Sequence, residues 1–295
     1  MTGNTFYILD VFAEEKYTGN QLAVVLMKNK LTDADMQKIA KEFNFSETTF
    51  ILSHKSVNNG YNVRIFTPER EVPFAGHPTL GTAYVIQKEV IKNPVDTVTL
   101  NLKVGQTPVK LNYKDGRIER LTMKQMEPVF GRIFYREQIS KILNIDASEI
   151  DNRFPVQEVS TGLPFIIVPL KSLNAIKMAK IEKEKYFELI KNTEAKAIFI
   201  FCPETYKKKN HLNARMFAPF YGIEEDPATG SANGCLAGYL VKHGYFGKNN
   251  INVKVEQGYE IGRPSLLFLK AKRDGDKIEI HVGGKVIEVA KGVLL

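Results

Sequence analysis

An internal duplication constrains the fold of this chain more than any other feature of its sequence. The segment 64–83 reads RIFTPEREVPFAGHPTLGTA, and the segment 215–232 reads RMFAPFYGIEEDPATGSA. Both begin Arg-x-Phe-x-Pro and end Pro-x-x-Gly-(Thr/Ser)-Ala. Three small or rigid residues recur at one offset (227 − 78 = 149), namely Pro78, Gly81 and Ala83 as Pro227, Gly230 and Ala232. We therefore expect two related halves.

Each copy has the pattern of a strand, an acidic turn and a helix start. We place His77 and Asp226 at the N-cap, and Pro78 and Pro227 at the first helical position, where a missing N–H costs nothing. The residues that follow are small and apolar nearly all round, which predicts buried helices. Free N–H groups and the positive dipole end at such a start form an anion site. The sequence thus predicts two anion sites, around residues 76–79 and 229–232.

The rest of the chain is mostly strands. An amphipathic helix is predicted from the capping residues Thr32 and Asp35 to about Asn44. In the second half a helical stretch is predicted over 181–191, and residues 253–257 are aligned with 102–106. Strands are predicted at 5–12, 22–26, 48–52, 61–66, 98–102, 109–113, 118–123, 165–168 and 197–201.

These elements indicate an α+β fold in which each half is a curved, barrel-like sheet around a central buried helix. The predicted domains are 1–125 and 126–295, with a C-terminal strand that crosses back to the first domain as the alternative. Arg64 and Arg215 are expected to form ion pairs with acidic neighbours such as Glu69 or Glu224.

Composition narrows the class of protein. A hydrophobic content of 43% and a charged content of 25% are typical of a soluble globular protein. The net charge of +8 is spread along the chain, and its densest run is only residues 207–209, so a small anionic substrate is favoured over nucleic acid. The first residues lack a signal-peptide pattern and no stretch is apolar enough to span a membrane, so we expect a cytoplasmic protein.

No cofactor or metal is expected from the motifs. Neither the P-loop nor the dinucleotide-binding glycine pattern occurs, and the histidines and the two cysteines, Cys202 and Cys235, lack metal-ligand spacing. Two cysteines also cannot form a disulfide framework, and both are expected to be reduced core thiols.

With these motifs in view, the chain resembles the PhzF family, the phenazine-biosynthesis-like relatives of diaminopimelate epimerase. The matching segments are Asp10-Val11-Phe12 with Gly19-Asn20, residues 44–50 (NFSETTF), and the two duplicated motifs. The resemblance implies two pseudo-symmetric halves with the active site in the cleft between them. It also implies a cofactor-free isomerase that acts by proton transfer and is commonly a homodimer.

The resemblance further implies roles for particular residues. Glu47 corresponds to the catalytic acid/base, while His77, Asp226, Gly76, Gly230 and Ser231 correspond to residues that bind the substrate. Diaminopimelate epimerase uses one cysteine beside each helix start. Here Gly76 and the segment 226–229 stand at those places and Cys235 lies inside the helix, so a two-thiol racemase is disfavoured.

Each of these residues also has a plainer interpretation. In isolation Glu47 is interpreted as a surface or capping residue, His77 as a helix cap or a core histidine, and Asp226 as a helix cap. Ser231 and its counterpart Thr82 are interpreted as small residues needed for close helix packing. Removing a proton from carbon requires a base with a pKa near the working pH, and burial raises the pKa of a carboxyl group in general. The leading hypothesis is a cofactor-independent isomerase of a small carboxylate-bearing substrate. The alternatives are an amino-acid epimerase or racemase, and a non-catalytic binding protein of the same fold.

Overall fold

The computed structural model describes residues 3–295, which form two compact units. The first unit runs to Lys124 and resumes at Gly283, and the second unit is Gln125–Val282. Within the described residues, no helix is both long enough and apolar enough to cross a membrane.

The first unit is a strongly curled mixed sheet. Strand β1 pairs antiparallel with β18 and β2, β2 pairs parallel with β3, and β3 pairs antiparallel with β4. The sheet continues with a parallel β4–β6 pair and antiparallel β6–β7 and β7–β8 pairs, while β5 lies antiparallel to β4. Its strands are β1 (Asn4–Val11), β2 (Asn20–Leu26), β3 (Thr48–Ile51), β4 (Tyr61–Phe66), β5 (Glu71–Val72), β6 (Thr97–Leu102), β7 (Gly105–Lys114), β8 (Arg117–Lys124) and β18 (Val286–Leu294).

The second unit repeats this pairing order step by step. The β10–β11 pair is antiparallel, β11–β12 is parallel, β12–β13 is antiparallel, β13–β15 is parallel and β15–β16 is antiparallel, with β14 against β13 and β9 against β10. The duplication seen in the sequence is therefore a duplication of the sheet. The strands are β9 (Val129–Phe134), β10 (Val156–Ser160), β11 (Pro164–Pro169), β12 (Ala197–Cys202), β13 (Leu212–Ala218), β14 (Ile223–Asp226), β15 (Asn250–Gln257), β16 (Ser265–Asp274) and β17 (Lys277–Gly284), which ends in the first unit.

The strand predictions of the first half are confirmed, with β7 beginning at Gly105 rather than at residue 109. One predicted alignment is wrong. Residues 102–106 cover the end of β6 and its turn into β7, whereas 253–257 lie inside β15. The register explains the error, because Asn62 pairs with Asn101 on β6 while its counterpart Asn213 pairs with Glu256 on β15. Residue 257 therefore corresponds to residue 102.

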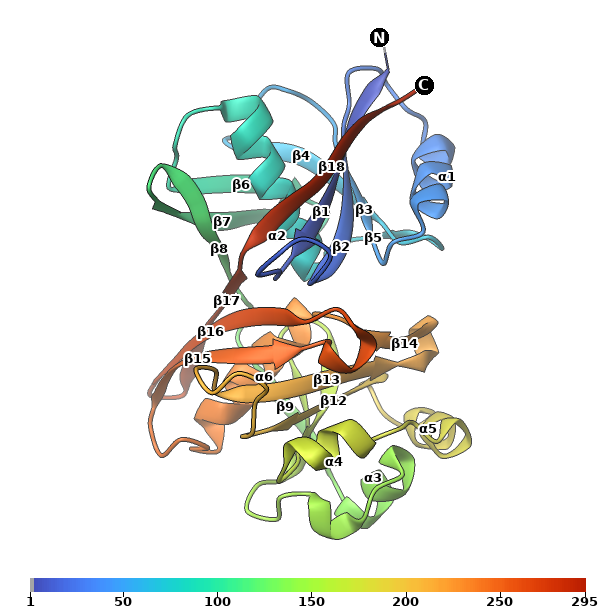
Figure 1. Cartoon of the computed structure of the whole chain (residues 1–295), viewed down its shortest axis with the longest axis vertical. Helices are drawn as coiled ribbons and strands as arrows, with labels where there is room; N and C mark the ends of the chain where they lie inside the picture. The colour runs from blue at the N-terminus through green and yellow to red at the C-terminus, as the bar shows by residue number, and fades with distance from the viewer. Residues whose placement is uncertain (1–2) are drawn as a thin grey trace. The chain divides into compact units, whose positions relative to one another are not determined.

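One buried helix runs through each unit, as predicted. Helix α2 (Gly76–Val85) continues into a π-helical stretch (Ile86–Ile91) and packs against β1, β2, β3, β6, β7 and β8 of the curled sheet (Figure 1). Helix α6 (Gly230–Lys242) packs in the same way against β10, β11, β15 and β16. Close packing needs small residues: a Cβ atom at Gly81 would lie 2.4 Å from Leu22 Cδ2 of β2.

The predicted starts of both helices are wrong. Helix α2 begins earlier, because the carbonyl of Ala75 accepts the first helical hydrogen bond, from Thr79 N at 3.3 Å, which puts His77 inside the first turn. Helix α6 begins later, because Asp226 still pairs in β14 and the first bond runs from Asn233 N to Thr229 O at 3.1 Å. The N-caps are therefore Ala75 and Thr229, and the two helix starts are not equivalent in the repeat.

Shorter helices cover the outer face of each sheet. Helix α1 (Asp33–Phe43) is capped as predicted, since Thr32 Oγ1 accepts from Asp35 N at 3.1 Å and Asn44 ends the helix in the left-handed conformation. In the second unit α5 (Lys183–Ile190) confirms the predicted helical stretch, but α3 (Arg136–Leu143) and α4 (Leu173–Met178) were not predicted. A core of buried side chains lies between these three helices and strands β10–β13.

The duplicated arginines hold these outer helices. Arg64 forms a bidentate pair with Glu71 and reaches Asp33 at the start of α1, at 2.6 Å. Arg215 pairs with Glu225 in the same way, and its Nη1 donates to the carbonyls of Ile176 and Ala179 at the end of α4. The prediction of acidic partners is right in kind, but the partners are Glu71 and Glu225 rather than Glu69 and Glu224.

The tight fit of α6 leads to a stability prediction. A Cβ atom at Gly238 would lie 2.8 Å from Cβ of the rigid Pro128 ring. Gly238→Ala should therefore lower the free energy of unfolding by about 1–3 kcal/mol, although the same change on an open helix stabilises by about 1 kcal/mol. Urea unfolding followed by circular dichroism measures the difference. Gly131→Ala on β9 is the comparison: its nearest neighbour would be Glu158 Cβ at 3.3 Å, a tight contact but not an overlap, so a smaller loss is expected. An unchanged midpoint for Gly238→Ala would contradict the tight packing.

Candidate active site

Glu47 lies in the short connection between α1 and β3. Asn44 turns the chain out of α1 with a φ of 53°, and Glu47 is the last residue before β3 begins at Thr48. Its side chain is 18% exposed, so the carboxyl group is largely desolvated but still reachable. A carboxyl group in such a place can exchange protons with a bound small molecule.

His77 approaches this carboxyl group from the first turn of α2. Its Nε2 atom lies 3.5 Å from Glu47 Oε2 and 3.3 Å from the carbonyl oxygen of Gln21 on β2. The imidazole side chain is only 7% exposed. The structure thus brings the two predicted residues of the first unit into direct contact.

Burial keeps the imidazole of His77 neutral. Removing the charged ring from water lowers the pKa of His77 from 6.5 to about 3. A neutral ring carries one N–H, and the Gln21 carbonyl beside Nε2 can only accept, so we assign the proton to Nε2. The same N–H then faces the Glu47 carboxyl group, at a distance longer than an ordinary N–H···O hydrogen bond.

Two hydroxyl groups fix β3 to α2 below this pair. Thr82 Oγ1 donates to the Pro78 carbonyl at 2.7 Å, so its remaining lone pairs accept from Thr49 Oγ1, also at 2.7 Å. Both threonines are fully buried. Thr82 is therefore more than a small packing residue, because it holds the strand that follows Glu47 against the helix that carries His77.

The start of α2 also offers backbone donors. The first helical bond is made by Thr79 N, so the N–H groups of Gly76 and His77 have no carbonyl one turn earlier to bind. Gly76 and His77 are both buried. An anionic group at this place would be stabilised by these N–H groups and by the helix dipole.

In the second unit, the helix start around Asp226 contains a dense hydrogen-bond network. Asp226 is 6% exposed, and its Oδ2 accepts from Thr229 Oγ1. Thr229 N is already bound to Gln257 Oε1 at 3.2 Å, so the open donors of α6 are the N–H groups of Gly230, Ser231 and Ala232. The carbonyl of Ser231 accepts from Thr161 Oγ1 at 3.5 Å. The sequence placed Thr229 in the predicted anion site through its backbone N–H group, which the structure shows bound to Gln257, and it did not indicate a role for the Thr229 hydroxyl group or for Gln257.

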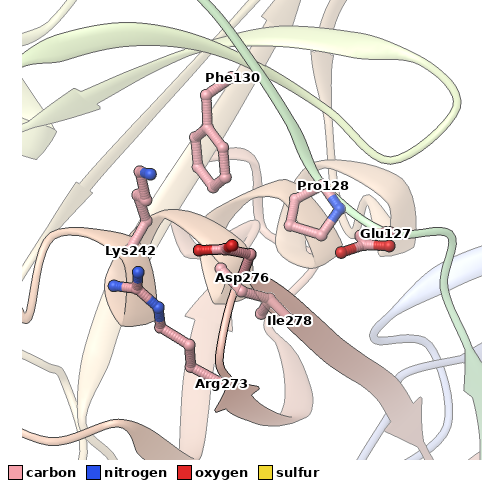
Figure 2. A pocket seen from close by; sticks show the side chains of 7 residues that line it. All are labelled: Glu127, Pro128, Phe130, Lys242, Arg273, Asp276 and Ile278. Atoms are coloured by element: carbon pink, nitrogen blue, oxygen red, sulfur yellow. The ribbon is translucent and has the colours of Figure 1, made fainter.

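A separate cavity of about 160 Å³ lies in the second unit, and Figure 2 shows the seven side chains that line it, namely Glu127, Pro128, Phe130, Lys242, Arg273, Asp276 and Ile278. None of the predicted site residues lines this cavity. Lys242 is the last residue of α6, which places the cavity about 18 Å from the helix start at a rise of about 1.5 Å per residue. Its Glu127 and Asp276 side chains are exposed and therefore solvated.

Both thiol groups are buried and protonated. Desolvation raises the pKa values of Cys202 and Cys235 to about 12. Cys235 lies inside α6 and its Sγ contacts Thr161 Oγ1 at 3.5 Å. Within residues 3–295, no three His, Cys, Asp or Glu side chains are placed to hold a metal ion.

Comparison with solved structures first defines the fold class. A probable proline racemase of Agrobacterium radiobacter has a TM-score of 0.67 at 10% identity, with 99% of this chain and 93% of that chain covered. At this identity the likeness shows the fold alone. The chain therefore has the duplicated, curled-sheet fold of racemases and epimerases.

More specifically, the chain belongs to the PhzC-PhzF family of phenazine biosynthesis-like proteins, whose model matches residues 9–292. The trans-2,3-dihydro-3-hydroxyanthranilate isomerase of Pseudomonas fluorescens is 32% identical, with 99% of each chain covered. A PhzF-family protein of Bacillus anthracis has a TM-score of 0.90 at 28% identity over the whole of both chains. The resemblance stated from the sequence is confirmed, and the chain is an isomerase of this family.

The lowered pKa of His77 leads to a prediction about how protein stability changes with pH. Below about pH 6.5 the His77 side chain is protonated in the unfolded chain but not in the folded chain. His77 therefore lowers the free energy of unfolding as the pH falls. NMR of protein labelled at its histidine nitrogens should show a neutral His77 ring throughout about pH 5–8. His77→Gln should also reduce the loss of thermal stability over that range. A His77 ring that titrates near its ordinary pKa would contradict this assignment.

Proposed function

We propose that this chain is a cofactor-independent isomerase that moves a proton within a small carboxylate-bearing substrate. The observation that supports the proposal is the contact between the largely buried Glu47 carboxyl group and the neutral His77 ring, at 3.5 Å. The activity of the Pseudomonas fluorescens relative supports trans-2,3-dihydro-3-hydroxyanthranilate as the first substrate to test.

Glu47 acts as the general acid/base in this proposal. Its carboxylate removes a proton from one substrate carbon and, as the carboxylic acid, returns it to another, so one group performs both halves of the reaction. The N–H on Nε2 of His77 provides a hydrogen-bond donor next to that carboxyl group, and because the ring is neutral it does not supply a full positive charge. No cofactor is needed, because a carboxyl group alone can move a proton.

Gly76 and His77 are proposed to bind the substrate through the start of α2. Their N–H groups and the helix dipole favour an anionic substrate group, and a contact with the dipole contributes about 0.3–2 kcal/mol. Asp226, Gly230 and Ser231 are proposed as further substrate-binding residues, since α6 offers N–H donors beside a buried carboxyl group. The homodimer and the cytoplasmic location remain predictions from the sequence.

An epimerase is the second candidate, and the racemase-like fold is the observation that favours it. Inverting one carbon requires a base on each of its two faces. The raised pKa values of Cys202 and Cys235 leave too little thiolate for a two-thiol mechanism, so His77 or Asp226 would have to be the second base. The third candidate is a binding protein without turnover. It is less favoured because it does not explain the contact between Glu47 and His77.

The test is incubation of the enzyme with trans-2,3-dihydro-3-hydroxyanthranilate and with a panel of small chiral carboxylates in heavy water, followed by NMR. A moved double bond with solvent hydrogen at a new carbon supports the isomerase. Exchange with loss of chirality and no moved double bond would favour the epimerase. Binding without any exchange would leave only the binding protein.

Replacement of the proposed base tests its role directly. Glu47→Gln keeps the shape of the side chain but removes its basicity, so turnover should fall by about a hundred- to ten-thousandfold. The variant should keep the circular dichroism spectrum and melting temperature of the parent within a few degrees. Glu42→Gln, an exposed change in α1, is the matched control and should be fully active. Activity of Glu47→Gln within threefold of the parent would rule out this residue as the base.

Removal of both thiols tests the alternative chemistry. Because burial keeps Cys202 and Cys235 protonated, the double variant Cys202→Ala/Cys235→Ala should retain turnover within about threefold. Each change removes one buried sulfur atom, so some thermal stability is expected to be lost. Loss of turnover in a variant that is still folded at the assay temperature would revive a thiol mechanism.

A further inference from the structure

The amide group of Gln257, the last residue of β15, makes four hydrogen bonds to the segment 226–233. Its Nε2 donates to the Asp226 carbonyl at 2.9 Å and to Thr229 Oγ1 at 3.1 Å. Its Oε1 accepts from Thr229 N at 3.2 Å and from Asn233 Nδ2 at 2.9 Å. The side chain is fully buried, and these bonds use its entire hydrogen-bonding capacity.

The orientation of this amide is fixed by its neighbours. Thr229 N–H can only donate and the Asp226 carbonyl can only accept. A flipped amide would therefore place its NH2 group against the N–H of Thr229 and its oxygen against the carbonyl oxygen of Asp226, and neither contact is a hydrogen bond. Gln257 therefore has one allowed orientation, with its NH2 group toward Asp226 and Thr229 Oγ1.

This orientation determines the direction of the Thr229 hydroxyl group. Thr229 Oγ1 accepts from Gln257 Nε2 and donates its own hydrogen to Asp226 Oδ2. A chain of donors thus runs from Gln257 through Thr229 to the Asp226 carboxyl group. Thr229 is also the N-cap of α6, yet its side chain makes no capping bond to the helix. The hydroxyl group that could cap the helix instead holds the carboxyl group.

The fold itself does not require this series of hydrogen bonds from Gln257 to Asp226. The strand register equates Asn213 and Glu256 with Asn62 and Asn101, which places Leu102 at the position of Gln257 in the first unit. Leu102 is apolar and cannot make these bonds, although the first unit has the same sheet and a central helix. The polar network belongs to the second helix start alone.

We propose that Gln257 and Thr229 are positioning residues that orient the Asp226 carboxyl group for substrate binding. This inference rests on the proposed function, in which Asp226 binds the substrate. Neither residue touches the substrate in this proposal. Gln257 fixes Thr229, and Thr229 occupies Oδ2, so the carboxyl group is presented in one orientation.

A first pair of variants tests the Thr229 hydroxyl group. Valine has nearly the shape of threonine and suits the extended backbone of this residue, so Thr229→Val should keep the fold but lower kcat/KM about ten- to a hundredfold. Thr229→Ser restores the hydroxyl group and should return kcat/KM to within about threefold of the parent. Thr193→Val is the control, since it removes a hydroxyl bond to Ala195 O elsewhere in the second unit. A merely structural role predicts a lower melting temperature for Thr229→Val, but a kcat/KM equal to that of Thr193→Val at a temperature at which both variants are folded.

A second pair of variants tests whether Gln257 must donate a hydrogen bond to Thr229. Gln257→Glu replaces the NH2 donor by an oxygen, and the introduced buried carboxyl group regains a donor only when protonated. The ratio of its kcat/KM to that of the parent should therefore rise at least threefold as the pH falls from about 8 to 6. Gln257→Leu lacks a titrating group, so its ratio should stay constant. Equal pH profiles for the two variants would overturn the proposal.

The assay substrate is trans-2,3-dihydro-3-hydroxyanthranilate, and Asp226→Asn separates the two possible failures. If Asp226→Asn is inactive while Thr229→Val is fully active, the positioning role is wrong and the proposed site stands. If Asp226→Asn is as active as the parent, Asp226 does not belong to the site and both proposals about it fail. An inactive parent enzyme would overturn the proposed function, and this inference with it.

Discussion

The structure depends on the burial of one apolar helix inside each curled sheet. Helices α2 and α6 are buried along nearly their whole length, so they carry small residues and almost no charge. Their backbone N–H groups are satisfied inside each helix except in the first turn, where no earlier carbonyl is available. In a buried helix, the backbone groups that still need hydrogen-bond partners are therefore gathered at its start. Glu47 and His77 lie at the start of α2, and Asp226 and Thr229 lie at the start of α6.

Much of this fold could be predicted because the repeated segments have strong local signals. The succession of strands was predicted, including 109–113 and 118–123, and the structure joins these two strands by a turn at Asp115 and Gly116, which have φ values of 50° and 73°. Helix α3 was missed because it has no capping side chain at Tyr135, although Ile139, Ile142 and Leu143 recur at helical spacing. The start of α2 was misplaced because proline is also tolerated later in the first turn, and Pro78 is the third residue of this helix rather than the first. The start of α6 was misplaced because Pro227 lies before the N-cap Thr229, outside the helix.

The candidate site was predictable only in part. Glu47 and His77 could be named from motifs, and their contact follows from the short connection between Asn44 and β3. The hydroxyl and amide groups around Asp226 could not be found in this way, since Thr229 and Gln257 differ in no local property from ordinary polar residues. Their importance depends on β14 and β15 both pairing with β13, which brings Gln257 to Asp226, and a single sequence does not reveal these pairings.

The same close packing that stabilises the first unit also sets the geometry of its site. Gly81 lets α2 approach β2 so closely that a side chain there would meet Leu22. His77 lies one turn earlier on that helix, and the neighbouring residue on β2 is Gln21, whose carbonyl lies 3.3 Å from the imidazole. A looser helix would move the ring away from both Gln21 and Glu47 and would admit water. Water would favour the charged imidazolium, so the neutral state of His77 requires that the ring stay buried against β2.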